Sequence, residues 1–103
     1  MSLQNVNIAQ GASKTVTLLP KDDNEQPGAL GGVPNVVSED PSGVVVTSIA
    51  TDGLSAVITA QNKPGVFTLD AQGLGLGQPT GFVTKFTATV PENPATHFDL
   101  SFS

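Results

Sequence analysis

The feature that most constrains this sequence is how often Gly and Pro interrupt short runs of Val, Thr, Phe and Ile. Eleven Gly and eight Pro are spread along 103 residues, and nearly all of them stand between the apolar runs, with Pro34 as an exception inside one. β-branched and aromatic residues favour strands, whereas Gly and Pro favour turns. The pattern therefore predicts many short strands joined by turns, with no stretch long enough for a stable helix.

Individual runs show the apolar and polar alternation of a half-buried strand. The clearest is 66–71, where Phe67 and Leu69 share one face and Thr68 and Asp70 share the other. Seven or eight such runs are present. The predicted strands are residues 5–9, 14–19, 33–38, 44–49, 55–60, 66–71, 82–90 and 96–102.

This number of short strands in about 100 residues predicts an all-β sandwich of two antiparallel sheets, rather than a small barrel. The length corresponds to one domain, 1–103. Asp52-Gly53 predicts a hairpin between two of the strands. The predicted core is Val16, Leu18, Val46, Ile58, Phe67, Leu69, Phe86 and Ala88, joined by Phe98, Leu100 and Phe102 if the last strand docks.

Composition excludes several functional classes. With no Cys, disulfides, zinc-thiolate sites and a cysteine nucleophile are excluded. Four scattered Lys, no Arg and a net charge of −5 argue against binding to nucleic acid or to an anionic membrane surface. No apolar run approaches the roughly 20 residues of a membrane span, and the first residues lack the pattern of a signal peptide.

The sequence also argues against an enzyme. His97, Asp99 and Ser101 would share one face of the last strand, but same-face neighbours there are about 6.6 Å apart, too far for a catalytic triad. One His, with neither Cys nor Arg, leaves few of the usual catalytic side chains. We therefore expect no catalytic residue and no cofactor.

Residues 21–32 are rich in polar residues, Gly and Pro, which predicts a long surface loop. Asp22, Asp23 and Glu25 are weak candidates for Ca²⁺ ligands, although Pro27 stands where an EF-hand loop needs Gly. A solvated acidic loop is the favoured interpretation. The lack of Trp and Tyr argues against a carbohydrate site built on aromatic stacking, but it does not exclude binding through loops. A module that binds carbohydrate or Ca²⁺ is therefore kept as the alternative function.

Short motifs carry a family resemblance. A Ser-Glu-Asp-Pro-Ser turn at 38–42 leads into a Val strand at 44–46, and the Asp-Gly hairpin at 52–53 precedes a Lys-Pro-Gly passage at 63–65. Together with 86–90 as the last strand, this order resembles the bacterial Ig-like domains of the group-2 type.

The resemblance spans residues 4–90 and has one departure. The family usually carries a Trp on its third strand, where this chain has Asn35-Val36-Val37, so we expect a core built on Phe. The resemblance implies an Ig-like sandwich that is a non-catalytic structural or binding module of a bacterial cell surface or a phage virion, with adhesion or assembly as its role.

Such a module works through protein partners or through self-association. The last predicted strand, 96–102, provides the candidate partner-binding residues Phe98, Leu100 and Phe102, which alternate with polar residues. We expect it to act either as an extra strand of this domain or as an assembly strand that pairs outside the chain.

Overall fold

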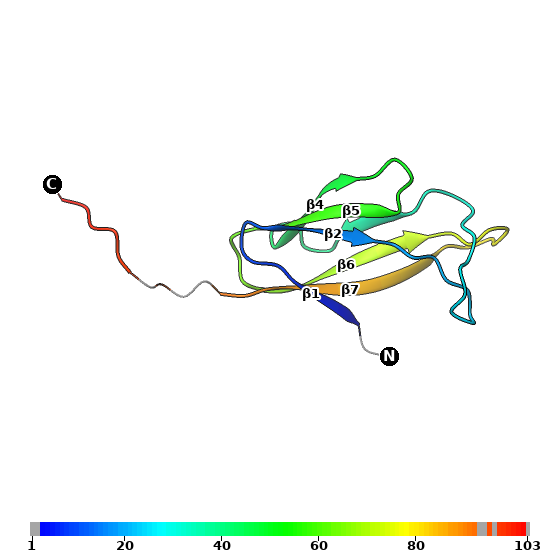
Figure 1. Ribbon diagram of the computed structural model, residues 1–103, viewed down its shortest axis with the longest axis horizontal. Helices are drawn as coiled ribbons and strands as arrows, with labels where there is room; N and C mark the ends of the chain where they lie inside the picture. Colours follow the sequence, from blue (N-terminus) through cyan, green and yellow to red (C-terminus); the bar gives the residue numbers. More distant parts are fainter. Residues whose placement is uncertain (1–2, 93–94, 96, 103) are drawn as a thin grey trace.

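The computed structural model describes residues 3–92, 95 and 97–102. Within this part of the chain all regular structure is β, and no helix that could span a membrane is found. Two sheets are stacked face to face (Figure 1), which confirms the predicted all-β sandwich. The strands are β1 (Gln4–Asn7), β2 (Ser13–Thr17), β3 (Asn35–Ser38), β4 (Val44–Ile49), β5 (Ser55–Ala60), β6 (Gly65–Gly73) and β7 (Phe82–Val90).

The strand order matches an immunoglobulin topology. One sheet has the order β1-β7-β6-β3 and the other β2-β5-β4, as in the Ig arrangement where the second, fourth and fifth strands face the third, sixth and seventh. The prediction of antiparallel strands fails for one pair, because β1 runs parallel to β7 with Gln4 opposite Phe86. These two strands are far apart in sequence, so no tight hairpin forces them to be antiparallel.

The Asp52-Gly53 hairpin and the loop 21–32 are both found where the sequence predicts them. β4 and β5 are antiparallel neighbours across the predicted Asp52-Gly53 hairpin, and Gly53 takes a φ of 72° that L side chains rarely adopt. Residues 21–32 form the predicted loop. Within the loop, Lys21 and Pro27 form an isolated β-bridge. A second isolated β-bridge, between Leu30 and Gly75, connects the loop to the β6–β7 connection.

The core lies between the two sheets and is mostly aliphatic. Four of the predicted core residues, Ile58, Phe67, Leu69 and Ala88, are buried. The other four sandwich residues, Val16, Leu18, Val46 and Phe86, are half-buried at its margin. The buried hydrophobic residues that the sequence analysis left out of its core are Ile8, Val36, Val44, Ala56, Ala60, Ala71 and Val90.

The expectation of a core built on Phe is wrong. Among the described residues Phe67 is the one buried Phe, and the largest fully buried side chains are aliphatic, Ile8 and Ile58 among them. Val36 occupies the core position on the third strand, with 3% of its surface exposed. Two closely spaced sheets filled by small and branched side chains need no large ring at that point.

The eighth strand is not formed. Residue 96, where it was predicted to begin, lies outside the described residues, and 97–102 belong to no strand. Phe98, Leu100 and Phe102 are 86%, 74% and 87% exposed, so they do not join the core. β7 ends before Pro91, which has no N–H to continue the ladder. Residues 97–102 lie away from the sandwich (Figure 1).

Candidate functional site

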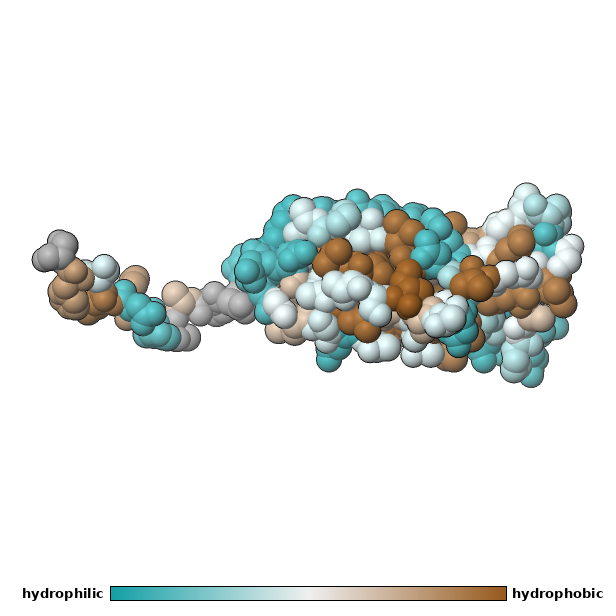
Figure 2. Space-filling model, turned by 90° about the horizontal axis from the view of Figure 1, so that it is seen from above, coloured by the Kyte–Doolittle hydropathy of each residue, from teal (hydrophilic) through white to brown (hydrophobic). Residues whose placement is uncertain are grey.

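The first candidate surface is the C-terminal segment, defined here as residues 97–102. Its three large apolar side chains, Phe98, Leu100 and Phe102, stand at every second position and are among the most exposed in the molecule. Figure 2 shows hydrophobic atoms on this projecting part of the chain and a run of hydrophobic surface across one face of the sandwich. Contiguous exposed apolar side chains are a common feature of interaction surfaces, so the segment stays a candidate.

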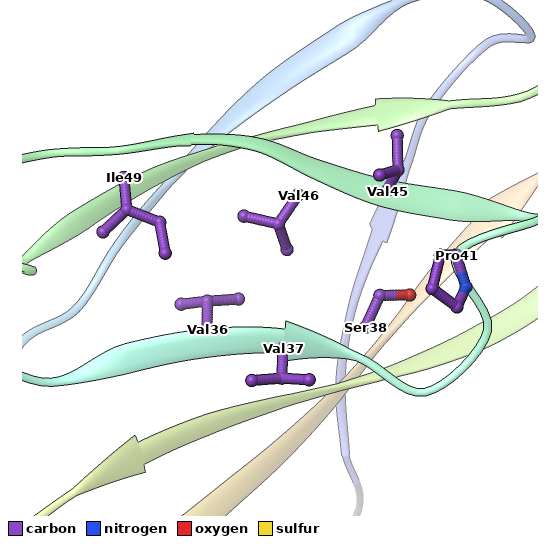
Figure 3. A pocket seen from close by; sticks show the side chains of 7 residues that line it. All are labelled: Val36, Val37, Ser38, Pro41, Val45, Val46 and Ile49. Atoms are coloured by element: carbon purple, nitrogen blue, oxygen red, sulfur yellow. The ribbon is translucent and has the colours of Figure 1, made fainter.

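The second candidate surface is the β3–β4 groove, which lies where β3 and β4 end their respective sheets on the same side of the sandwich. In Figure 3, Val36 points from β3 toward β4, while Val46 and Ile49 point from β4 toward β3. The groove has a volume of about 330 Å³. Its lining is Val36, Val37, Ser38, Pro41, Val45, Val46 and Ile49.

Local features of β3 and β4 shape this groove. The Ser38 hydroxyl donates a hydrogen bond to the Val44 carbonyl, which ties the two sheets together at one end. A β-bulge between Val46 and Ser48 interrupts the pairing of β4 with β5, and a bulge increases the local twist of a strand. Ile49, beyond the bulge, is 41% exposed at the groove.

The outer edge of β3, the end strand of its sheet, borders the groove. The Glu39 N–H donates to the Thr68 carbonyl at 3.0 Å, which continues the antiparallel register in which Val37 lies opposite Asp70. Because hydrogen-bonded and non-bonded pairs alternate along such a ladder, the N–H and C=O of Val36 point away from β6. These groups are buried, because Val36 as a whole residue is 3% exposed and Gly53 of the β4–β5 turn lies against the neighbouring Pro34 carbonyl.

An ion-pair cluster on the outer face of the same sheet was missed by the sequence analysis. Lys85 Nζ lies 2.7 Å from Glu39 Oε2 and 2.9 Å from Asp70 Oδ1. The hydrogen bond from Lys85 lowers the pKa of Asp70, and the bond to Glu39, followed by that to Asp70, raises the pKa of Lys85. Strand alternation predicts Asp70 on the polar face of its strand, but only the register of β6 with β7 sets Lys85 opposite it.

The three candidate Ca²⁺ ligands lie in the exposed loop 21–32, and one of them, Asp22, stabilises the loop through hydrogen bonds to its backbone. Asp22 Oδ1 accepts the backbone N–H groups of Asn24 at 2.8 Å and of Gln26 at 2.9 Å. Asp23 and Glu25 are exposed beside it, and Glu25 has a φ of 60°. No group of three or more His, Asp or Glu side chains that could hold a metal ion is found in the part of the chain that the structure describes.

A second hollow, of about 530 Å³, lies at the far end of the sandwich between this loop and the β6–β7 connection. Its lining includes Asp22, Asp23, Gln78 and Phe82. The Phe82 ring is 48% exposed and is packed over Gly73. Small-molecule sites combine aromatic side chains with a few polar groups in this way.

Comparison with known proteins bears on the fold. No protein-family model matches the chain, and no curated protein matches it. Among solved structures, the chain is similar to the crystal structure of domains 4 and 5 of the S-layer protein SbsC, at 18% identity with a TM-score of 0.62. The match covers 85% of this chain and 47% of that one, so this chain spans about half the length of the structure it resembles.

This likeness supports the sandwich architecture without extending to a particular family. The resemblance to group-2 bacterial Ig-like domains is therefore supported at the level of fold, by the strand order and by the S-layer structure. His97, Asp99 and Ser101, discounted above as a triad, are all exposed in the C-terminal segment.

Proposed function

We propose that this protein is a non-catalytic Ig-like structural module of a bacterial cell surface or a phage virion, and that it works by assembly with copies of itself. The observation that carries the proposal is the C-terminal segment, in which three large apolar side chains are exposed at alternate positions. An extended chain with this alternation has one apolar face and one polar face, which is what a strand needs to add to another sheet.

The chemistry of the chain favours this role over catalysis. The sequence contains a single His, with neither Cys nor Arg, so most nucleophile and general-base arrangements have no residues to use. The likeness to S-layer domains supports an Ig-like sandwich, an architecture that many cell-surface domains share. The surface and virion settings themselves come from the resemblance to bacterial Ig-like domains.

Sedimentation equilibrium of the intact chain beside a chain truncated after Val90 tests the proposal. We expect the intact chain to self-associate as its concentration rises, and the truncated chain to remain a monomer. At concentrations where the intact chain is monomeric, thermal unfolding of both should give similar midpoints, because the removed apolar side chains are exposed; association should raise the midpoint of the intact chain alone as its concentration rises. An intact chain that stays monomeric, or a truncated chain that still assembles, would contradict the proposal.

A carbohydrate-binding function is the second candidate, and the hollow beside Phe82 is the observation that favours it. A glycan screen of the full chain tests this function. Binding that is lost in Phe82→Ala and kept in Val83→Ala, a matched change at an exposed neighbour, would support it. Binding unaffected by Phe82→Ala would place the ligand elsewhere.

A further inference from the structure

The sheet that contains β2 lacks the strand that closes it in the constant-type Ig arrangement. There the first strand lies beside the second strand, in one sheet with the fifth and the fourth. Here β1 lies beside β7 in the other sheet, so β2 is the end strand of the order β2-β5-β4. Among the described residues, the outer edge of β2 therefore has no neighbouring strand.

The main chain of β2 is open along this edge. Just after β2, the Leu18 N–H donates to the Leu54 carbonyl at 2.7 Å, in the register of the β2–β5 ladder. Because bonded and non-bonded pairs alternate along such a ladder, the N–H and C=O groups of Thr15 and Thr17 point away from β5. Both residues are exposed, unlike Val36 at the end of the other sheet. Within the described ranges, no backbone hydrogen bond outside the ladders involves either of them.

The core is incompletely covered beside the same edge. Six hydrophobic residues are only half-buried at the margin of the core, and four of them lie between residues 6 and 18, on β1, on β2 or just after. Val16 faces the interior because it lies opposite the buried Ala56, and Leu18 follows it on the same face. A strand added beside β2 would cover both side chains.

We infer that the C-terminal segment of a second copy of this chain adds as an antiparallel strand to the outer edge of β2. This inference rests on the proposed function and names the surface that receives the segment. The main-chain groups of Thr15 and Thr17 form hydrogen bonds with the segment. The apolar face of the segment covers the half-buried margin of the core.

One register matches the two strands residue by residue. Asp99 and Ser101 then lie on the outer, solvated face, opposite Thr17 and Thr15. On the inner face every apolar side chain of the segment has a partner. The inner pairs are Phe98 with Leu18, Leu100 with Val16, and Phe102 with Lys14.

Lys14 gives this edge a preference for the segment. It lies opposite the buried Ile58, so it is on the inner face, where a charged side chain disfavours pairing with an arbitrary apolar strand. The ring of Phe102 accommodates it, because an ammonium group over an aromatic ring is a favourable contact. The chain already contains such a contact, with Lys63 Nζ 5.7 Å from the centroid of the Phe67 ring.

The donor is a second copy because of where the chain leaves its own sandwich. Gln10 Nε2 donates to the Pro91 carbonyl at 3.2 Å, so the chain leaves β7 beside the end at which β2 begins. The antiparallel register requires Phe98 at Leu18, about 20 Å further along β2. The seven residues from Pro91 to Phe98 span at most about 25 Å, which leaves too few residues for the turn that reverses the chain.

The contact that results is head-to-tail. In one molecule the outer edge of β2 is exposed and residues 97–102 lie away from the sandwich (Figure 1). Each copy therefore donates one segment and accepts one. Contacts of this type produce open chains or closed rings rather than isolated two-fold dimers.

A complementation experiment with two full-length variants tests the inference. The acceptor variant carries Phe98→Ser, Leu100→Ser and Phe102→Ser, so that it keeps the β2 edge and loses the apolar face of the segment. The donor variant carries Thr15→Pro, which removes an N–H that points away from β5 and so leaves the ladder with β5 intact.

Asn7→Pro is the matched control. It places the same ring on β1, the exposed end strand of the other sheet. The ladder of that sheet should also be kept, because the neighbouring Ile8 donates its N–H to the Thr89 carbonyl and Asn7 points the other way. Circular dichroism of each variant checks that it is folded.

We expect each of the two test variants alone to associate at least about tenfold more weakly than the unmodified chain. An equimolar mixture should form a one-to-one dimer and stop there, because one copy has no segment to donate and the other has no edge to accept one. Asn7→Pro should assemble like the unmodified chain. A mixture that stays monomeric would overturn the inference.

A crosslinking measurement keeps the test valid if Thr15→Pro does not fold. The chain has no native Cys, so Lys14→Cys and Phe102→Cys are placed in separate full-length chains. As a non-hydrogen-bonded pair they should lie about 4.5 Å apart between Cα atoms, within reach of a disulfide. Under mild oxidation we expect heterodimers in excess over homodimers of either chain.

The matched pair for crosslinking is Lys14→Cys with Phe98→Cys. In the antiparallel register Phe98 lies four residues further along, about 13 Å away, so this pair should give few heterodimers. Equal yields from the two pairs, or a larger yield with Phe98→Cys, would overturn the inference.

The remaining outcomes separate this inference from the proposed function. If the unmodified chain assembles and Thr15→Pro assembles equally well, β2 is not the receptor, although self-assembly stands. If the unmodified chain is monomeric at every concentration, both fail. If it is monomeric and hydrogen exchange shows a protected C-terminal segment, the segment has docked on its own sandwich and the second copy is excluded.

Discussion

The ring of Phe67 lies so close to Gly43 that no other residue fits at position 43 without movement of the ring. A Cβ built on Gly43 would lie 2.1 Å from Cε1 and 2.3 Å from Cδ1 of Phe67. Gly43 sits in the turn that carries the chain from β3 to β4, and Phe67 is the buried Phe of β6. The core thus packs directly against the backbone of the turn that closes one end of the β3–β4 groove.

Gly43→Ala should therefore destabilise the protein. We expect the free energy of unfolding to fall by about 1–3 kcal/mol, the usual effect of overpacking a core. Gly32→Ala is the matched control, because its Cβ would meet no atom within 4 Å, and it should change the free energy by less than about 0.5 kcal/mol. Urea unfolding of the unmodified protein, Gly43→Ala and Gly32→Ala measures both changes in the free energy of unfolding. Equal stability of the two variants would show that the Phe67 ring rotates away freely.

Truncation of Leu69 tests where the core is centred. Leu69 is fully buried between the sheets, so Leu69→Ala should lower the free energy of unfolding by about 2–5 kcal/mol. Leu19→Ala removes the same atoms from a side chain that is 71% exposed. It should cost less than about 0.5 kcal/mol. Comparable losses in the two variants would mean that the sandwich is packed differently.

The ion pair between Lys85 and Asp70 predicts a loss of stability in acid. The pKa of Asp70 is held below its ordinary value of 3.8 by Lys85, so the unfolded chain binds the proton more readily than the folded one. The contribution is present above pH 3.8 and is lost as the pH falls through the lower folded-state pKa. We expect Asp70→Asn to reduce this acid dependence in denaturant titrations across the pH range.

Two features of that experiment make it specific. Part of the acid dependence should remain in Asp70→Asn, since a hydrogen bond from Ser42, together with Lys63, also lowers the pKa of Asp40. Asp23→Asn is the control, because Asp23 is an exposed loop carboxylate that forms no ion pair among the described residues. An unchanged acid dependence in Asp70→Asn would show that the cluster does not persist in solution.

Calcium titration tests the loop at Asp22. One oxygen of Asp22 already accepts two backbone N–H groups, whereas Ca²⁺ requires six to eight oxygen ligands. We expect no saturable heat in isothermal titration and no shift in melting temperature. Saturable binding that disappears in Asp22→Asn and persists in Asp52→Asn would revive the calcium function.

The sequence predicted most strands because their alternation is local. β4 and β5 match the predicted ranges at both ends, and β7 matches over its whole length. Burial was harder to predict, as Phe82 shows. It shares a face with Phe86, yet it is 48% exposed, because the nine-residue β6 and β7 extend beyond the shorter strands of the opposite sheet.

By itself the sequence determined the approximate positions of the seven strands of the sandwich, the turns between them and the alternation of the C-terminal segment, since these depend on neighbouring residues and on backbone preferences at Gly and Pro. Tertiary structure alone decided that β1 runs parallel to β7, that Lys85 meets Asp70 and Glu39, and that β3 and β4 leave an apolar groove at the edge of the sandwich. The first two join segments that are separated in the chain, and the third depends on the relative position of the two sheets. Their register is set by how two sheets pack together, which no local pattern records.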